Sequence, residues 1–571
     1  MYKEIDLILK RYNYNSKKLL QILLDVQEIS IKNNISQSVA IYIAEALDIS
    51  LSQIDAMVNF FSVLSTSPRG KNIIRVCKST SCMVNGHKNL LDIIKKELDI
   101  KIGETTKDSL FTLETTECIG ACDKAPAFKI NNKVYGNLCE SKIKDILRSY
   151  KTIEHEKSVH FLSRNFGKYN SEHISEYIAT GGFENLKEIF DQSKQKTIDK
   201  IKSSGLRGRG GAGYPTGKKL MQAKSVKGDR KILICNADEG EPGTFKDRQI
   251  IEKDPFHILE GMIITGYLIN ATDGYIYIRH EYNHLHRKLK YVIEKAREAG
   301  FLGKNILDSG FDFDIKVFSG AGSYVCGQGG ALIESMEGKV GYPRTKPPYT
   351  KVKGLDQLPT LVINVETLAT IASILNIGLE EFKKYGTKKS PGTKLISISG
   401  NVVNPGVFEV PFDITINEII NDLAKGSNKG DIKFIQIGGA SGSLMPKKDF
   451  DLKLCYDELK DKGYGIGSGA IIVCNEDQRI IDYLETVYNF FEHESCGKCT
   501  PCREGSHIIA KNIRKYAKGE VDFDKFLEMK DIALKVKDSA LCGLGQTSST
   551  ALVSALKHFE NELRQEGDLD G

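Results

Sequence analysis

The chain has 571 residues, of which 40% are hydrophobic and 27% charged, which is the composition of a globular protein with roughly four domains. Its net charge of +6 is small for this length, so composition gives no support for nucleic-acid binding. No apolar run reaches the ~18 residues needed to span a bilayer, and acidic residues stand where a signal peptide would be basic and then apolar. We therefore expect a cytoplasmic protein without membrane insertion.

The first 68 residues are predicted to form a helical bundle. One stripe of apolar residues at helical spacing is expected to be buried in it: Leu19, Leu20, Leu23, Val26 and Ile29. Further along, Ser50-Leu51-Ser52-Gln53 has the form of a capping box, which predicts a later helix running through Phe60 and Phe61.

Residues 69–150 alternate between strand and helix patterns, and a charged linker near 151–157 follows them. Four of the 13 cysteines stand at the ends of predicted strands, in two loop pairs: Cys77, Cys82, Cys118 and Cys122. Without a secretion signal, such pairs indicate a metal rather than disulfides. Spacing alone leaves both zinc and an iron–sulfur cluster open. Cys139 lies outside this quartet, and we interpret it as an ordinary buried thiol.

Residues 158–385 contain two stretches typical of a ligand site. Between residues 205 and 213 five glycines are interleaved with two arginines, and two lysines follow at 218 and 219. Glycine lets backbone N–H groups approach a ligand, so this loop favours a phosphate-bearing cofactor, with a flexible linker as the alternative. The second stretch, 236–247, places carboxylates just after the apolar run 232–235, where α/β sheets bind ligands. No G-x-G-x-x-G motif opens a βαβ unit here, so the site is not a Rossmann fingerprint.

The last two regions differ from each other in pattern. Residues 393–476 alternate apolar and polar positions between turns, hold no catalytic cluster and are expected to be structural. Residues 477–571 are helical and contain a C-x2-C-x2-C run with a fourth cysteine forty residues later: Cys496, Cys499, Cys502 and Cys542. This is the pattern of a cubane [4Fe–4S] site, whereas zinc more often uses two separated C-x2-C pairs.

The two stretches around 205–219 and 236–247 resemble the flavin and nucleotide site of the flavoprotein subunit of respiratory complex I. The same module occurs in NAD(P)-linked hydrogenases and formate dehydrogenases. The N-terminal cysteine spacing resembles the thioredoxin-like [2Fe–2S] subunit of complex I, fused here onto the flavoprotein. The resemblance implies a multidomain α/β and α+β protein. Its predicted parts are a helical bundle (1–68), a thioredoxin-like [2Fe–2S] domain (69–150), an α/β FMN and NAD(P)-binding domain (158–385), a ubiquitin-like β-grasp (SLBB) domain (393–476) and a helical [4Fe–4S] domain (477–571).

The resemblance also implies roles for individual residues. The [2Fe–2S] ligands would be Cys77, Cys82, Cys118 and Cys122, and the [4Fe–4S] ligands Cys496, Cys499, Cys502 and Cys542. FMN contacts would come from Gly208, Arg209, Gly210, Gly211, Lys219, Asn236, Asp238, Glu239, Gly327, Asn364 and Thr367. Dinucleotide contacts would come from Tyr214, Glu241, Gly329, Arg344, Lys346 and Tyr349, with Glu241 as the residue that positions the dinucleotide for reaction.

Two departures from the family pattern stand out. The family usually carries two glutamates after Gly327, where this chain has Gln328 and Gly329, and two asparagines before Val365, where it has Ile363 and Asn364. A glutamate at the position of Gly329 would bond the adenosine ribose and repel a 2′-phosphate. Its absence therefore predicts NADP(H) rather than NAD(H), with Arg344 and Lys346 as phosphate donors.

Together these parts predict an FMN-dependent NAD(P)H oxidoreductase. Because a dinucleotide gives two electrons at once and clusters carry one, a flavin between them is chemically required. The expected partners are the iron–sulfur and catalytic subunits of a hydrogenase or formate dehydrogenase complex. Ferredoxin is a further partner if the flavin bifurcates electrons. The alternatives are the NADH-input module of a complex I-like enzyme, an iron–sulfur scaffold whose flavin site has decayed, and a zinc-bearing nucleotide-binding module without redox chemistry.

Overall fold

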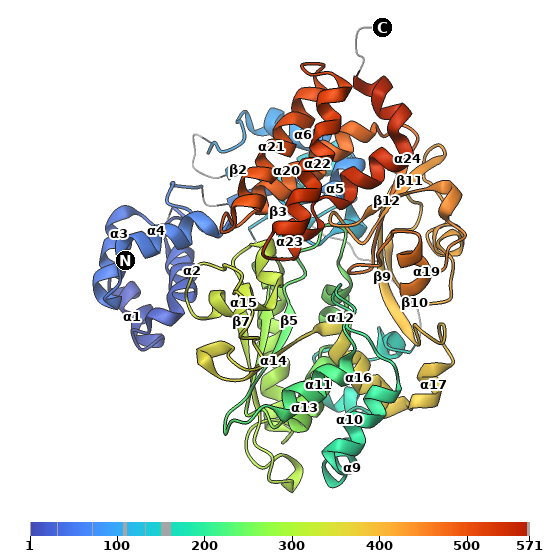
Figure 1. The fold of residues 1–571 in the computed structure, drawn as a ribbon. Coiled ribbons are helices and arrows are strands. Elements are labelled where there is room, and N and C mark those ends of the chain that lie inside the picture. Colours follow the sequence, from blue (N-terminus) through green and yellow to red (C-terminus); the bar gives the residue numbers. More distant parts are fainter. Residues whose placement is uncertain are drawn as a thin grey trace.

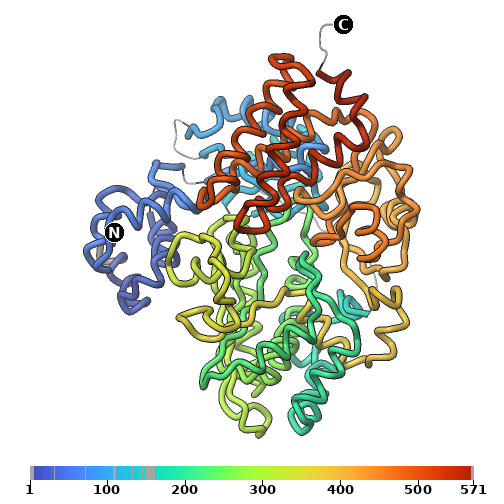
Figure 2. The backbone as a smooth tube through the Cα atoms, viewed as in Figure 1, coloured from blue at the N-terminus to red at the C-terminus, as the bar shows by residue number. Residues whose placement is uncertain are grey.

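The computed structural model describes residues 2–30, 32–70, 72–106, 111–131, 133–149 and 161–567, so the linker predicted near 151–157 lies outside the described residues. Within them the chain is a mixed α/β protein with three sheets and with helical regions at both ends (Figure 1). Figure 2 follows the chain from the N-terminal helices, through a region next to the C-terminal helices, into the lower α/β part and back upward. The described residues include no helix with both the length and the apolarity required to cross a membrane.

The N-terminal region is the predicted helical bundle. It consists of α1 (Tyr2–Arg11), α2 (Leu19–Ile29), α3 (Gln37–Leu47) and α4 (Leu51–Phe60). The capping box is confirmed, because Ser50 and Gln53 exchange side-chain and backbone hydrogen bonds at the start of α4. The apolar stripe of α2 is buried except at its end, where Ile29 is 40% exposed. Expecting Ile29 in the core was therefore wrong, since the helix ends at this residue.

The thioredoxin-like region has a four-stranded sheet in the order β2-β1-β3-β4. Its elements are β1 (Asn72–Cys77), α5 (Thr80–Val84), α6 (His87–Leu98), β2 (Phe111–Thr116), β3 (Phe128–Ile130), β4 (Lys133–Tyr135) and α7 (Glu140–Ser149). β1 pairs in parallel with β2 and antiparallel with β3. One cysteine pair spans the end of β1 and α5, and the other lies in the loop after β2, so both pairs meet at one edge of the sheet. Contrary to expectation, Cys139 is exposed.

The second sheet is wholly parallel, in the order β7-β6-β5-β8. Its strands are β5 (Ile232–Ala237), β6 (Asp273–Ile278), β7 (Asp314–Ser319) and β8 (Thr360–Asn364). The helices around it are α8 (Ile174–Ala179), α9 (Leu186–Asp191), α10 (Lys194–Ser203), α11 (Thr216–Ser225), α12 (Lys246–Lys253), α13 (Pro255–Ile269), α14 (Asn283–Glu298), α15 (Gly329–Met336), α16 (Val365–Ile377) and α17 (Leu379–Lys383). The backbones of α13 and α16 approach closely, because a Cβ on Gly261 would lie 2.2 Å from the Leu368 carbonyl oxygen. The predicted stretch 236–247 begins at the carboxyl end of β5, whereas the Gly-rich stretch 205–219 follows α10 and runs into α11.

The third sheet has five strands in the order β10-β9-β13-β11-β12, with β9 and β13 parallel at its centre. Its elements are β9 (Thr393–Gly400), β10 (Gly406–Pro411), α18 (Ile416–Glu418), β11 (Ile432–Ile437), β12 (Ser443–Pro446), α19 (Tyr456–Asp461) and β13 (Ala470–Asn475). The C-terminal helices are α20 (Ile480–Glu494), α21 (Thr500–Ala517), α22 (Phe523–Ser539), α23 (Gly543–Thr547) and α24 (Thr550–Gly567). Helix α20 packs against α5, so the C-terminal helices contact the region that contains the first cysteine quartet, although the two are far apart in sequence (Figure 1).

Candidate functional site

The Gly-rich loop is pinned to the N-terminus of α16. The backbone N–H of Arg209 donates to the Thr367 hydroxyl at 2.9 Å, and a Cβ on Gly210 would lie only 3.0 Å from the Cβ of Asn364. Gly211 has φ +126°, which a residue with a side chain adopts only with strain. The loop therefore runs against the end of β8 and needs glycine at both positions.

The Arg209 side chain is buried and lies over the Phe412 ring, with its guanidinium carbon 4.6 Å from the ring centroid. Its Nε and Nη2 are buried without a hydrogen-bond partner among the described residues. Unsatisfied buried donors are costly, so an arginine in this state fits a site that binds an anionic group such as a phosphate.

A second group of predicted flavin residues meets beyond β5. The Asn236 side chain donates to the Gly327 carbonyl at 2.8 Å and accepts from the Asp238 N–H at 3.1 Å. Asp238 Oδ2 is buried without a partner among the described residues, and burial raises the pKa of this carboxyl to about 8. Across the sheet edge, Asn364 donates to Asp247 at 2.6 Å. These side chains leave unused polar atoms at the edge where a cofactor is expected.

Glu239 has a structural role that the sequence did not indicate. Its carboxylate accepts the backbone N–H groups of Asp247 at 2.8 Å and Arg248 at 3.1 Å, at the start of α12, and the Tyr282 hydroxyl at 3.0 Å. Three donors from the chain itself thus hold this carboxylate at the start of α12. Glu239 caps this helix, and its contact with FMN stays a prediction.

Beneath the Gly-rich loop lies a buried ionic network that sequence reasoning missed. The Glu366 carboxylate accepts from Lys246 at 2.9 Å and Lys394 at 2.8 Å, and Lys394 also donates to the Arg209 carbonyl at 3.2 Å. Burial raises the pKa of Glu366, but the two ammonium groups outweigh burial and lower the pKa to about 2. Lys394 lies in β9, a strand whose residues are all buried, and buried lysines are normally paired.

Glu241 lies where the parallel sheet meets the third sheet. Its carboxylate accepts the Ser441 N–H at 2.9 Å, the Ser441 hydroxyl at 2.8 Å and the Tyr324 hydroxyl at 2.7 Å. The turn before Ser441 comes so close that a Cβ on Gly439 would lie 2.4 Å from the Glu241 Cγ. The pKa of Glu241 is raised overall, because burial outweighs the bonds from Ser441 and Tyr324, which lower it.

Two tyrosines predicted to contact the dinucleotide are exposed, whereas Lys219, predicted to contact FMN, is bonded within the chain. Tyr214 and Tyr349 are 41% and 54% exposed, and their rings are accessible to a ligand. Lys219 donates to the Val362 carbonyl at 2.6 Å, and burial followed by the charge of Lys346 lowers its pKa to about 8.

Arg344 does not match its expected role. Its guanidinium forms ion pairs with Glu334 and, at 2.9 Å, with Glu337, and it donates to the Gly354 carbonyl at 3.0 Å. Because two carboxylates already neutralise this side chain, we withdraw Arg344 as a donor to a 2′-phosphate. Gly329 begins α15, and a Cβ there would meet nothing nearer than Val362 at 3.6 Å, so a side chain fits at this position.

The first cysteine quartet is entirely buried. Cys77 interacts with both Cys82 and Cys118, and the sulfurs of Cys118 and Cys122 are 3.4 Å apart. The Arg279 guanidinium donates to the Cys118 carbonyl at 2.7 Å and to the Glu239 carbonyl. One buried arginine therefore joins the thiol loop to the loop that carries Asp238 and Glu241.

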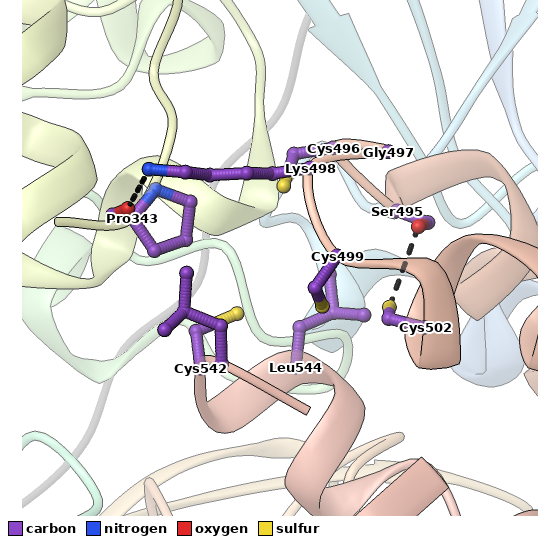
Figure 3. Close-up of a pocket in the computed structure, with 10 residues that line it drawn as sticks. Pro343, Ser495, Cys496, Gly497, Lys498, Cys499, Cys502, Cys542 and Leu544 are labelled. Atoms are coloured by element: carbon purple, nitrogen blue, oxygen red, sulfur yellow. Dashed lines mark hydrogen bonds between the residues drawn. The ribbon is translucent and has the colours of Figure 1, made fainter. Parts of the chain in front are cut away.

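The second quartet surrounds a small cavity (Figure 3). Its lining residues are Pro343, Ser495, Cys496, Gly497, Lys498, Cys499, Cys502, Leu541, Cys542 and Leu544. Nowhere in the described ranges do three His, Cys, Asp or Glu side chains converge on a position for a single metal ion. Both quartets consist of thiols alone, which is the donor set of iron–sulfur clusters.

Three family models match the chain. They are the Nuo51 FMN-binding domain (residues 201–373), the thioredoxin-like [2Fe–2S] ferredoxin (5–151) and the NADH-ubiquinone oxidoreductase-F iron–sulfur binding region (482–566). These matches exclude the zinc-bearing module. They also confirm FMN, a [2Fe–2S] cluster and a [4Fe–4S] cluster as the cofactors.

Similar proteins include hydrogenase and complex I subunits. The NAD-reducing hydrogenase HoxS subunit alpha of Cupriavidus necator is 34% identical over 100% of this chain and 96% of its own length. The NADP-reducing hydrogenase subunit HndC of Solidesulfovibrio fructosivorans is 43% identical over 72% of this chain and 84% of its own. The mitochondrial NADH dehydrogenase (ubiquinone) flavoprotein 1 of Dictyostelium discoideum is 39% identical over 68% of this chain and 82% of its own.

The fold matches a solved structure over nearly its whole length. A chain of an NAD+-reducing [NiFe]-hydrogenase in the air-oxidised state superposes with a TM-score of 0.83 and 27% identity, covering 97% of this chain and 94% of that one. This chain is thus an FMN-dependent NAD(P)H oxidoreductase subunit that transfers electrons between NAD(P)(H) and iron–sulfur clusters. It belongs to the family of flavin and iron–sulfur subunits that is shared by respiratory complex I and the NAD(P)-linked hydrogenases, with the thioredoxin-like and flavoprotein parts in one polypeptide.

Proposed function

We propose that this chain is the dinucleotide-oxidising or dinucleotide-reducing subunit of a hydrogenase complex. The observation that carries the proposal is the Gly-rich loop, with its unpartnered Arg209 donors, in the same chain as one buried thiol quartet and a second that surrounds a small cavity. The HoxS alpha subunit, similar over the full length of this chain, supports a hydrogenase rather than complex I. A complex I module is the second candidate, supported by the 39% identity to the Dictyostelium flavoprotein.

Bound FMN would supply the conversion between a two-electron hydride and single electrons. We propose that it is held by the backbone of the Gly-rich loop, by nearby side chains and by the end of β8: Gly208, Arg209, Gly210, Gly211, Lys219, Asn236, Asp238, Gly327, Asn364 and Thr367. The free guanidinium donors of Arg209 suit the phosphate end. Asp238, with a pKa of about 8, keeps its proton at neutral pH and can donate a hydrogen bond from Oδ2.

For the dinucleotide we propose that Tyr214 and Tyr349 stack on the nucleotide and that Lys346 binds its phosphates. Glu241, fixed by Ser441 and Tyr324, would orient the reacting end. The preference for NADP(H) remains our proposal from Gly329, now with Lys346 as donor in place of Arg344. It is supported by the similarity to HndC, an NADP-reducing hydrogenase subunit.

The five-part domain division also remains a proposal, with boundaries as predicted. The third sheet supports a ubiquitin-like β-grasp domain at 393–476, because its two central strands are parallel and its first strand pair is antiparallel. Formate dehydrogenase and ferredoxin as partners, electron bifurcation and a cytoplasmic location stay predictions.

Purification of the full chain tests the proposed function. We expect one FMN and about six irons per chain if both cluster sites are filled. Reduction of a dye by NADPH and by NADH then measures the activity, and mass spectrometry of proteins co-purified from the native cell identifies the complex. Absence of flavin would contradict the function, and recovery of quinone-reductase subunits would favour complex I.

A further inference from the structure

The segment from Gly341 to Lys346 is held in place by contacts from three directions. A Cβ on Gly341 would lie 2.5 Å from the Cys326 sulfur and 3.2 Å from the Phe60 ring, so the segment is closely packed at its start. The Phe60 ring also meets the Tyr342 ring edge-on, with centroids 6.0 Å apart. On its other side the segment reaches the [4Fe–4S] site, because Pro343 lines that cavity.

The contact on the cluster side is made by Lys498. This residue lies between two thiol ligands in sequence, and its side chain extends across the cavity wall toward Pro343 (Figure 3). Its ammonium donates to the Pro343 carbonyl at 2.6 Å and lies 6.0 Å from the centroid of the Tyr342 ring. A short bond from a charged donor to a backbone carbonyl is among the stronger hydrogen bonds in proteins.

The position of this bond connects two sites. Pro343 is three residues before Lys346, the proposed dinucleotide donor, whereas Lys498 is one residue before Cys499 and two after Cys496. A displacement of the segment 343–346 would therefore be transmitted to the loop that carries two of the four thiols. The ammonium also places a positive charge beside four cysteines that would be thiolates when they hold a cluster, so a change in its position would alter the electrostatic environment of the cluster.

We propose that Lys498 is a positioning residue that couples dinucleotide binding to the [4Fe–4S] site through the Pro343 carbonyl. The inference rests on the proposed function, because it takes segment 343–349 as part of the dinucleotide site. Coupling between two sites is reciprocal. Reduction of the cluster must therefore change dinucleotide affinity by the same factor by which dinucleotide binding changes the equilibrium between oxidised and reduced cluster.

The test uses ADP-ribose and its 2′-phosphate, which resemble the dinucleotides but lack the nicotinamide and so carry no electrons. The full chain, reduced with dithionite, is examined by low-temperature EPR with and without saturating probe. We expect the probe to shift the [4Fe–4S] signal in the unmodified protein, to leave it unchanged in Lys498→Met, and to shift it again in Lys498→Arg, which retains a charged donor. Lys511→Met, at an exposed position on α21, the helix that begins two residues after Lys498, is the matched control and should behave like the unmodified protein.

Calorimetric titration of the same proteins gives the second readout. Loss of one charge-assisted bond should weaken probe binding by about tenfold in Lys498→Met but not in the control. An unshifted EPR signal in the unmodified protein, or an equal shift in Lys498→Met, would overturn the coupling. If Lys498→Met lacks cluster iron, Lys498→Gln, with a neutral donor, replaces it and should show a reduced shift. Failure of the unmodified protein to bind either probe would instead contradict the proposed dinucleotide site.

Discussion

Replacing Glu366 by glutamine is expected to destabilise the protein by about 3 kcal/mol at neutral pH. Glutamine keeps the shape and the acceptor for the Leu395 N–H, which lies 2.9 Å from Oε1, but removes the charge that Lys246 and Lys394 share. The surroundings lower the pKa of Glu366 from 4.5 to about 2. At about 1.36 kcal/mol for each pKa unit, this preference for the carboxylate over a neutral group gives about 3 kcal/mol.

The pH dependence follows from the direction of the same shift. Because the pKa of Glu366 is lower in the folded protein than the ordinary 4.5, its contribution is fully present above about pH 4.5. The contribution is lost as the pH falls toward 2. The difference in free energy of unfolding between the unmodified protein and Glu366→Gln should therefore narrow as the pH falls below about 4.5, whereas near pH 8 it also depends on Lys394, because burial lowers the pKa of that ammonium to about 8.

Urea unfolding measures this difference. Since the chain has no tryptophan, circular dichroism and the release of FMN fluorescence are the suitable signals. Glu380→Gln is the matched control, because the Glu380 side chain is 86% exposed and its ion pair with Lys383 is long, at 3.9 Å. We expect its urea midpoint to equal that of the unmodified protein. Equal midpoints for Glu366→Gln and Glu380→Gln at pH 7 would refute the importance of the buried network.

Three further outcomes are expected. Gly329→Glu should move the dinucleotide preference toward NADH by about ten- to thirtyfold, since a carboxylate repels a 2′-phosphate by on the order of 1–2 kcal/mol in a wet site. Gly329→Gln, which adds no charge, should leave the preference unchanged. NADH oxidation far above NADPH oxidation in the unmodified protein would show that the argument fails. Cys499→Ser should abolish the [4Fe–4S] EPR signal and leave the [2Fe–2S] signal, and loss of both signals from folded protein would speak against two separate sites. Ser441→Ala should raise KM for the dinucleotide about tenfold with a smaller effect on kcat, because Glu241 loses one hydroxyl donor and its pKa rises. Ser441→Thr, which keeps a hydroxyl, should restore the unmodified values. An unchanged KM and pH profile in Ser441→Ala would exclude a positioning role for Ser441.

Sequence patterns predicted what depends on neighbours along the chain. The capping box at Ser50, the strand before Asn236 and the spacing of the thiol quartets are local signals, and the structure or the family matches agree with them. Glu239 and Arg344 could not be assigned in this way. Their partners, Tyr282 for one and Gly354 for the other, become neighbours only after folding, and a charged residue in a matched motif looks the same whether it faces a ligand or its own chain.

The same limitation explains the missed network. Lys394 belongs to the third sheet, and its partners Glu366 and Arg209 belong to the parallel sheet's region, so only the packing of two regions reveals the contact. Exposure at helix ends is similarly decided by the surroundings, which is why Ile29 follows the apolar period of α2 yet is not in the core.

Arg279, which links the Glu239 and Cys118 carbonyls, has a consequence for how the protein behaves on dilution. The match to the Dictyostelium flavoprotein covers 68% of this chain, whereas the match to the HoxS alpha subunit covers all of it. Where both sides of such a contact are on one polypeptide, their encounter is intramolecular, with an effective concentration on the order of millimolar. A contact of this kind does not need to be tight enough to hold two separate chains together. Electron exchange between the flavin region and the Cys118 site should therefore proceed at the same rate per molecule at nanomolar and at micromolar protein.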